Sequence, residues 1–154
     1  MPVTSSGLFL NTFERCFNGS DLVIDWVNDT IKCALFTNTI TPNFTTDTAY
    51  NSAPYNANQV SGAGYTAGGV TLSGETVSKT TVAGSLTFDA NDAQWTTATF
   101  SGARAALIWD DTITASPADP VVCLVNLGAD YGVTSGTFTI QWATTGIFSL
   151  DLTP

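Results

Sequence analysis

The chain has no histidine and very few basic residues. Histidine is the commonest general base and metal ligand, so its absence removes the Ser-His and Cys-His arrangements on which many nucleophilic enzymes depend. Only four residues are Lys or Arg, thirteen are Asp or Glu, and the net charge is −9. A nucleic-acid surface needs clustered basic side chains that displace counterions. The basic residues here are scattered, so we expect no nucleic-acid partner and no anionic membrane surface; they are Arg15, Lys32, Lys79 and Arg104.

Charged residues of either sign are scarce, at 11% of the chain, against about 25% in a typical soluble domain. The carboxylates of Asp89–Asp92 and of Asp110-Asp111 are neighbours within single turns. A glycosidase instead needs two carboxylates on facing walls of a cleft. Ser61–Val77 is rich in glycine but lacks the Lys-Ser/Thr end of a phosphate-binding loop. The sequence therefore predicts no catalytic, cofactor-binding or metal-binding residues, and a protein that is not an enzyme.

Long apolar runs and paired cysteines are also missing. No apolar run approaches the roughly 20 residues of a membrane helix, and Met1–Ser6 lacks the basic start of a secretory signal. Three cysteines, Cys16, Cys33 and Cys123, form an odd set without CxxC spacing. We expect them to be unpaired, small apolar residues of a protein made in a reducing compartment.

The residues that are abundant favour β-structure. Hydrophobic residues make up 44% of the chain, and threonine, a β-branched residue that favours strands, is the commonest residue. A chain of 154 residues is long enough for one self-sufficient core. We predict a mainly β fold: a single-domain β-sandwich or barrel-like structure with one short N-terminal helix. Residues 1–7 are predicted to be an N-terminal lead or arm, and residues 8–154 the single domain.

The helix is predicted at Leu8–Asn18, and Gly19 supplies its stop signal. Four apolar residues recur there with helical spacing: Phe9, Phe13, Cys16 and Phe17. So short a helix must be held by docking rather than by its own propensity. Two interpretations remain open at this point: the helix covers an open end of the core, or it is an arm that docks on a partner.

Short apolar or alternating runs, separated by turn residues, predict the strands. Leu22–Val27 and Ile31–Thr37 are predicted to form a hairpin through the Asn28-Asp29-Thr30 turn. Gly102 is interpreted as a break and Gly128–Gly136 as a loop. The other predicted strands are Val70–Val77, Lys79–Phe88, Trp95–Phe100, Ala103–Asp110, Val121–Leu127, Thr137–Trp142 and Ile147–Leu152. Turns every 8–12 residues or so are typical of a sandwich or barrel.

Two segments between the predicted strands are distinctive. In Ser61–Val77, several glycines surround Tyr65, which predicts a sharply specified turn pinned by the tyrosine ring, with a flexible linker as the alternative. Asn38–Gln59 is a long polar connection whose aromatic residues indicate that it packs on its own domain or on a neighbour. With Phe9, those aromatic residues are the candidate interaction residues: Phe44, Tyr50 and Tyr55.

Several stretches, taken in order, resemble a family of small virion proteins of tailed bacteriophages. They run from about residue 8 to residue 152 and read IDWVNDTIKCALFTN, VSGAGYTAGGVTLSGETV, FDANDAQW, RAALIWDD and CLVNLGADYGVTSGTFTIQWATTGIFSL. The most telling pieces are GYTAGG at residues 64–69 and GTFTIQW at residues 136–142. These motifs are structural rather than catalytic.

The resemblance implies a structural protein that decorates the phage head, a decoration or cement protein on the outer capsid surface. It would be made in the bacterial host cytoplasm, bind the major capsid protein or other virion proteins, and form a homo-oligomer, with a trimer favoured. A weakly charged surface supports this independently, because it can be buried with little desolvation of charge. The alternative is a tail or head–tail component, or a receptor- or carbohydrate-binding module of the virion.

Overall fold

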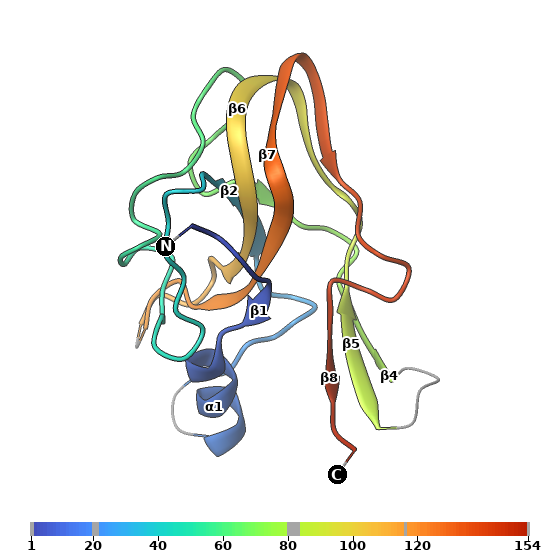
Figure 1. Ribbon diagram of the computed structural model, residues 1–154. Coiled ribbons are helices and arrows are strands. Elements are labelled where there is room, and N and C mark those ends of the chain that lie inside the picture. Colours follow the sequence, from blue (N-terminus) through green and yellow to red (C-terminus); the bar gives the residue numbers. More distant parts are fainter. Residues whose placement is uncertain (1, 20–21, 80–83, 116, 154) are drawn as a thin grey trace.

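The computed structural model describes residues 2–19, 22–79, 84–115 and 117–153. It has a mainly β fold that forms a sandwich-like single domain with one short helix, which confirms the predicted fold class (Figure 1). The elements, in chain order, are β1 (Gly7–Leu8), α1 (Leu10–Asn18), β2 (Ile31–Phe36), β3 (Val70–Thr71), β4 (Thr76–Lys79), β5 (Ser85–Asp89), β6 (Ala93–Asp110), β7 (Val121–Ile140) and β8 (Phe148–Asp151).

The strands form two antiparallel sheets. The larger sheet has the order β1-β7-β6-β2-β3, and the smaller one has the order β4-β5-β8. Strands distant in the sequence pair closely: Gly7 and Leu8 of β1 lie opposite Leu124 and Cys123 of β7. The N-terminal lead is therefore fastened to the domain, and the Val3 side chain is buried.

Strands β6 and β7 are much longer than predicted. Figure 1 shows both strands arching over the top of the molecule and descending on the side of β4, β5 and β8. Gly102, predicted as a break, is an interior residue of β6 with φ of +77°, and residues 128–136, predicted as a loop, belong to β7. Several register shifts accompany this bend. The glycines therefore mark bulges that curve continuous strands, as glycine does where a strand bends sharply.

The larger sheet is buried on both faces, and β2 shows how. Ile31, Cys33 and Leu35 face one buried cluster, which fills the space between the sheets, whereas Ala34 and Phe36 face a second cluster. The second cluster lies beneath the connection 38–59 and includes Ile40 and Tyr55. The β2 side chains are thus divided between two buried clusters, one on each face of the sheet.

The predicted helix is present, but the four residues of its predicted apolar stripe do not all pack on one surface. Phe9 precedes α1, has an extended backbone and belongs to the second cluster, whereas Phe13 belongs to the first. Phe17 is 71% exposed. The helix is fixed to β7 by the Thr12 hydroxyl, which donates to the Val121 carbonyl at 2.6 Å, and it ends at Gly19 with φ of +65°.

The predicted hairpin is wrong. Residues 22–30, all of which the structure describes, contain no strand, and β2 pairs with β3 and β6 instead. The Asp25 carboxylate accepts hydrogen bonds from the backbone and side-chain amides of Asn28, and the Asp25 N–H donates to Asp29 at 2.7 Å. These local bonds satisfy a compact turn that competes with strand pairing.

The predicted strand 70–77 is divided between the two sheets. Its first residues form β3 and its last begin β4, and Gly74, with φ of +68°, lies between them. The next predicted strand, 79–88, is represented by β5, although its residues 80–83 lie outside the described ranges. At the other end of the chain, β8 alternates as predicted, with Phe148 and Leu150 half-buried and Ser149 and Asp151 exposed.

Tyr65 anchors the glycine-rich segment to β2. Its hydroxyl accepts a hydrogen bond from the Leu35 N–H at 2.8 Å and donates to the Gln59 amide oxygen at 3.1 Å. The ring packs against Trp95 and Phe100. The segment is thus a specified turn rather than a flexible linker, as the sequence predicts.

The three cysteines are unpaired, as predicted. Cys33 and Cys123 are buried in the sheet, and burial raises the pKa of both thiols. Cys16 is half-buried on α1, where desolvation also raises its pKa. All three therefore remain in the protonated thiol form at neutral pH.

Candidate interaction surface

The aromatic residues proposed from the sequence as interaction residues pack against the protein's own core, two of them fully buried and two partly buried. Phe9 and Tyr55 are both 0% exposed, and their ring centroids lie 5.8 Å apart. Phe44 is partly buried against Phe9, and Tyr50 stacks on Trp109 with centroids 4.0 Å apart. The four aromatic residues therefore hold the connection 38–59 onto the larger sheet, and the side chains of Phe9 and Tyr55 offer no surface to a partner.

An apolar hollow, here called the α1 groove, lies between the helix and the smaller sheet. Its volume is about 120 Å³, and it is lined by Phe13, Cys16, Phe17, Trp26, Val77, Leu86, Thr87, Phe88, Phe148 and Leu150. The alternation of β5 and β8 turns one face of the smaller sheet toward α1. Phe17 and Val77 are both exposed large hydrophobic residues, Val77 at 43%.

Aromatic contacts make the floor of the α1 groove rigid. Trp26 stacks on Phe13 with ring centroids 5.9 Å apart, and it also packs on Phe88 at 5.5 Å. Phe148 meets Phe13 edge to face at 5.8 Å. Exposed apolar area of this kind marks surfaces that bind other proteins. The exposed Phe17 side chain lies beside these packed aromatic rings, so a partner could contact it with little rearrangement of the groove.

The opposite face of the smaller sheet carries a second hollow, here called the hydroxyl groove. Its volume is about 510 Å³, and its lining residues are Thr76, Ser78, Ser85, Thr87, Asp89, Thr144, Thr145, Gly146, Ser149 and Asp151. Ser78, Thr87 and Ser149 lie side by side across the three strands. The Thr87 hydroxyl is buried without a hydrogen-bond partner among the described residues. The groove therefore combines neutral hydroxyl groups with negative charge.

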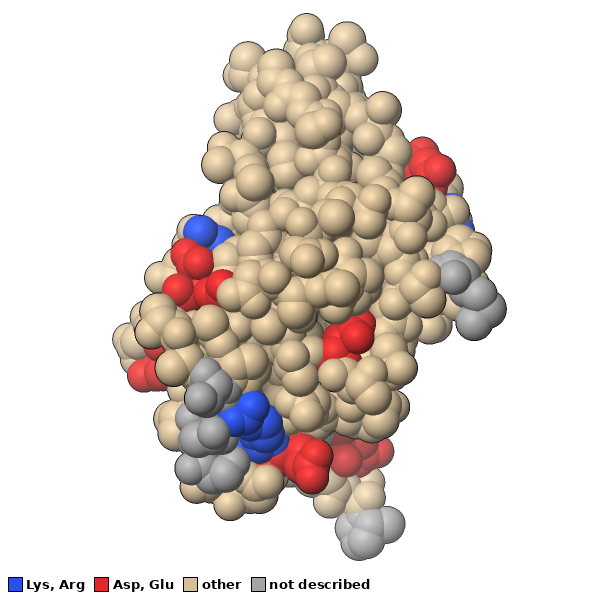
Figure 2. Space-filling model, turned by 90° about the vertical axis from the view of Figure 1, so that its left-hand side faces the viewer, with Lys and Arg blue, Asp and Glu red and all other residues tan. Residues whose placement is uncertain are grey.

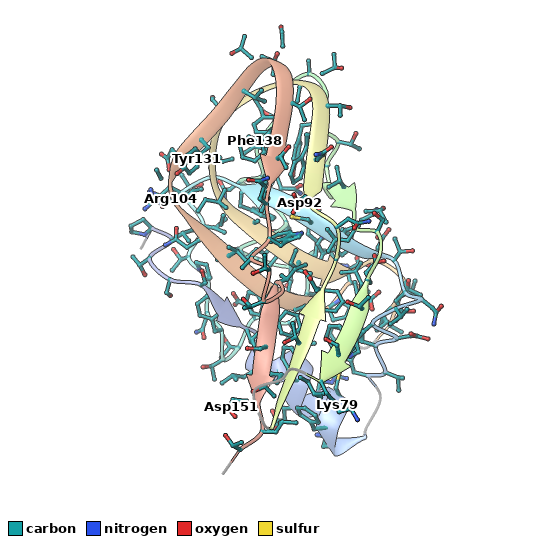
Figure 3. All side chains as sticks on the ribbon, turned by 90° about the vertical axis from the view of Figure 1, so that its right-hand side faces the viewer. Lys79, Asp92, Arg104, Tyr131, Phe138 and Asp151 are labelled. Carbon is teal, nitrogen blue, oxygen red and sulfur yellow. The ribbon has the colours of Figure 1, made fainter. Side chains whose placement is uncertain are left out.

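The end of the molecule farthest from α1, here called the tip, has no charged residue. It consists of residues 94–103 of β6, residues 131–140 of β7 and the adjoining loop 61–64. Figure 2 shows this end as an uninterrupted uncharged surface. Its exposed side chains are chiefly Thr and Ser, together with Gln94 and the 49% exposed ring of Tyr131. The ion pair between Arg104 and Asp130, 3.3 Å apart, borders it; Figure 3 labels Arg104 next to Tyr131 of the tip.

Among the carboxyl groups of the described residues, the buried one of Asp110 has the most strongly shifted pKa. It terminates β6, is 0% exposed, and accepts hydrogen bonds from the backbone N–H groups of Thr112 and Ile113 at 2.7 and 3.4 Å. Burial raises the pKa of this carboxyl group to about 6, and the neighbouring Asp29 carboxylate adds to the rise. Asp110 thus acts as a cap for the following turn.

The raised pKa gives a testable pH dependence. The native protein binds the proton of Asp110 at a pH at which the unfolded chain has released it, so the stabilisation is complete below about pH 4 and is lost as the pH rises through 6. The wild type should lose this stabilisation as the pH rises, whereas Asp110→Asn cannot titrate. The difference in the free energy of unfolding should therefore change in favour of Asp110→Asn by on the order of 1 kcal/mol between pH 4.5 and pH 7.5. Urea unfolding at both pH values measures this. Equal stability differences between Asp110→Asn and the wild type at the two pH values would contradict the assignment.

No described residues form a cluster of three or more His, Cys, Asp or Glu side chains that could hold a metal ion. The described part of the chain also has no helix long and apolar enough to cross a membrane. Comparisons of the chain with protein-family models, with curated proteins and with solved structures found no match. The surfaces described above therefore carry the functional argument.

Proposed function

We propose that the protein is a non-enzymatic structural component of a tailed-phage virion that decorates the head. It binds the outer surface of the capsid lattice, where its partner is the major capsid protein or another virion protein, and it stabilises the particle. The observation that carries the proposal is the α1 groove, an apolar hollow with the 71% exposed ring of Phe17 beside it. The resemblance of the sequence to small virion proteins supports the same function.

The chemistry of the α1 groove suits repeated docking on a protein lattice. Burial of a phenylalanine side chain contributes roughly 1.5–3 kcal/mol, which is modest for one contact. A lattice presents the same site many times, and a homo-oligomer, with a trimer favoured, would convert modest contacts into avidity. The net charge of −9 favours a position outside the shell, away from the packaged DNA.

We predict that Phe17→Ser weakens binding to capsids about tenfold or more while the domain stays folded, because the change removes apolar contact area from an already exposed position. Co-sedimentation with phage heads stripped of the protein measures the affinity. Leu10→Ser is the matched control: Leu10 belongs to the same helix and is 56% exposed, but it does not line the groove. Circular dichroism of both variants checks the fold.

The outcome that opposes this proposal is specific. If stripped heads do not bind the wild-type protein, or if purified virions carry only a handful of copies, head decoration is wrong. Equal loss of binding in Phe17→Ser and Leu10→Ser would instead place the contact elsewhere on the protein.

A second candidate is a tail or head–tail component that binds a receptor or carbohydrate, and the hydroxyl groove favours it. Hydroxyl groups and the carboxylates of Asp89 and Asp151 can exchange hydrogen bonds with neutral sugars, whereas negative charge disfavours anionic ones. Binding of the wild-type protein to host cells or to neutral polysaccharide, together with a low copy number in the virion, would support this candidate over decoration.

A further inference from the structure

The outer edge of β7 is open along the tip. One edge of β7 pairs with β6 throughout, whereas on the other edge β1 reaches only Cys123 and Leu124. Beyond these residues the Ser6 hydroxyl accepts a hydrogen bond from the Asn126 N–H at 2.9 Å. Among the described residues, no strand pairs with this edge from residue 131 to residue 140. A row of backbone donors and acceptors is therefore available at the tip.

The alternation of the strand indicates which backbone groups face outward. Just beyond the end of β7, the Trp142 N–H donates to the Asp92 carboxylate at 3.0 Å, on the side of β6. Since successive residues of a strand direct their backbone groups to opposite sides, Ile140 and Phe138 also face β6. Thr137 and Thr139 then present their N–H and C=O groups to the open edge.

The last part of this edge lacks most of the features that keep natural edge strands unpaired. Such strands are protected by lysine, proline, charged side chains, bulges or extreme shortness. Ser135, with φ of +48°, lies at a bulge, and its N–H donates to the Thr99 hydroxyl of β6 at 2.9 Å, so the edge is regular only beyond this residue. Residues 136–142, GTFTIQW, contain no charged residue and no proline, and they are rich in the β-branched and aromatic residues that favour strands. A regular, neutral edge of this kind is a template for another strand.

We propose that two copies of the chain pair through this edge, with residues 136–140 of each β7 lying antiparallel across a two-fold axis. One antiparallel contact between identical strands closes both open edges at once, because a two-fold interface uses the same surface on each copy. The proposal does not depend on the virion function, and it gives a dimer where the resemblance favours a trimer. It also leaves the α1 groove free, because α1 lies at the opposite end of the molecule (Figure 1).

The charge distribution favours a second copy as the occupant. Each chain carries a net charge of −9, so two copies repel each other wherever their charged surfaces meet. The tip has no charged residue, and a contact there keeps the negative groups of both copies apart. Its Ser and Thr side chains also lose less rotamer freedom on burial than long charged side chains do.

Sedimentation velocity of the purified protein over a range of concentrations tests the proposal. We expect a reversible dimer of twice the 16.1 kDa chain mass, and we expect added salt to strengthen it because salt screens the repulsion. Thr137→Lys, which brings two like charges together near the axis, should raise the dissociation constant at least tenfold. Thr46→Lys introduces the same charge at an exposed position of the connection 38–59, outside the tip, and should change it less than threefold.

Hydrogen exchange locates the contact independently of the variants. The Thr137 and Thr139 amides should become protected as the protein concentration rises, while those of α1 should not. A monomer at all concentrations, a trimer, or a dimer that Thr137→Lys leaves intact would overturn the proposal. A monomer whose β7 edge becomes protected only when another protein is added would identify a different occupant, and would equally refute pairing between two copies.

Discussion

Replacement of Gly69 by alanine should destabilise the protein by about 4 kcal/mol or more, or prevent folding. Gly69 has φ of +81°, and a Cβ atom there would lie 1.8 Å from the carbonyl oxygen of Cys33 and 2.6 Å from the Cα of Ala34. Both atoms belong to the backbone of β2, which is paired on both sides and cannot move away. The added carbon must therefore displace either the glycine-rich turn or the centre of the larger sheet.

Gly128→Ala is the matched control for this prediction. Gly128 has the same φ of +81°, but nothing lies within 4 Å of a Cβ atom built there. Its replacement should cost only the strain of a left-handed backbone, about 1–2 kcal/mol. Urea unfolding of the wild type and both variants gives the two free energies. A similar loss in the two variants would show that the close approach of Gly69 to β2 contributes nothing.

Tyr55→Ala should destabilise the protein by about 3–5 kcal/mol, because it empties a large space in the second cluster. The Tyr55 ring contacts Phe9 and Phe36 edge to face, with centroids 5.8 and 5.6 Å apart. Its hydroxyl donates to the Asp47 carboxylate at 2.9 Å. The substitution thus removes ring contacts and leaves the carboxylate without one of its donors.

Tyr55→Phe separates these two contributions. The ring is kept and only the hydrogen bond to Asp47 is lost, so a smaller cost of about 1–2 kcal/mol is expected. Chemical denaturation at one pH measures both variants. If Tyr55→Ala were as stable as the wild type, Tyr55 would not be part of the core, and its role as an interaction residue would have to be reconsidered.

The sequence predicts well those elements whose pattern is set by their immediate neighbours. The alternation of β2 and β8, the stop of α1 at Gly19 and the anchoring by Tyr65 all follow from local spacing. In each case the residues that determine the local conformation are also the residues that pack against the core. Propensity and packing then favour the same structure, so a short window of sequence is sufficient.

The errors arise where a residue type has more than one use. Glycine ends some strands and bends others, and the choice at Gly102 depends on the pairing of β6 with β7, which lies outside any short window. Asn28-Asp29 suits a hairpin, yet the carboxylate of Asp25 completes a different turn. Aromatic residues in a polar connection can face a partner or the core, and Tyr55 faces the core.

The α1 groove was only partly predictable. The helical spacing of Phe13 and Phe17 and the alternation of Phe148 and Leu150 each indicate an apolar face. No short stretch of the sequence indicates that these two apolar faces meet, or that Trp26 fills the space between them. Their meeting depends on how β4, β5 and β8 separate from the larger sheet, which is a property of the whole topology.

The pairing of distant strands also determines when the protein can fold during its synthesis. Gly7 and Leu8 are made long before their partners, Leu124 and Cys123. β5 likewise pairs with β8, which is made long after it. The nascent chain therefore exposes Phe9, whose N–H donates to the Val122 carbonyl, until β7 has been made, and non-local pairing of this kind slows folding and prolongs the exposure of apolar side chains.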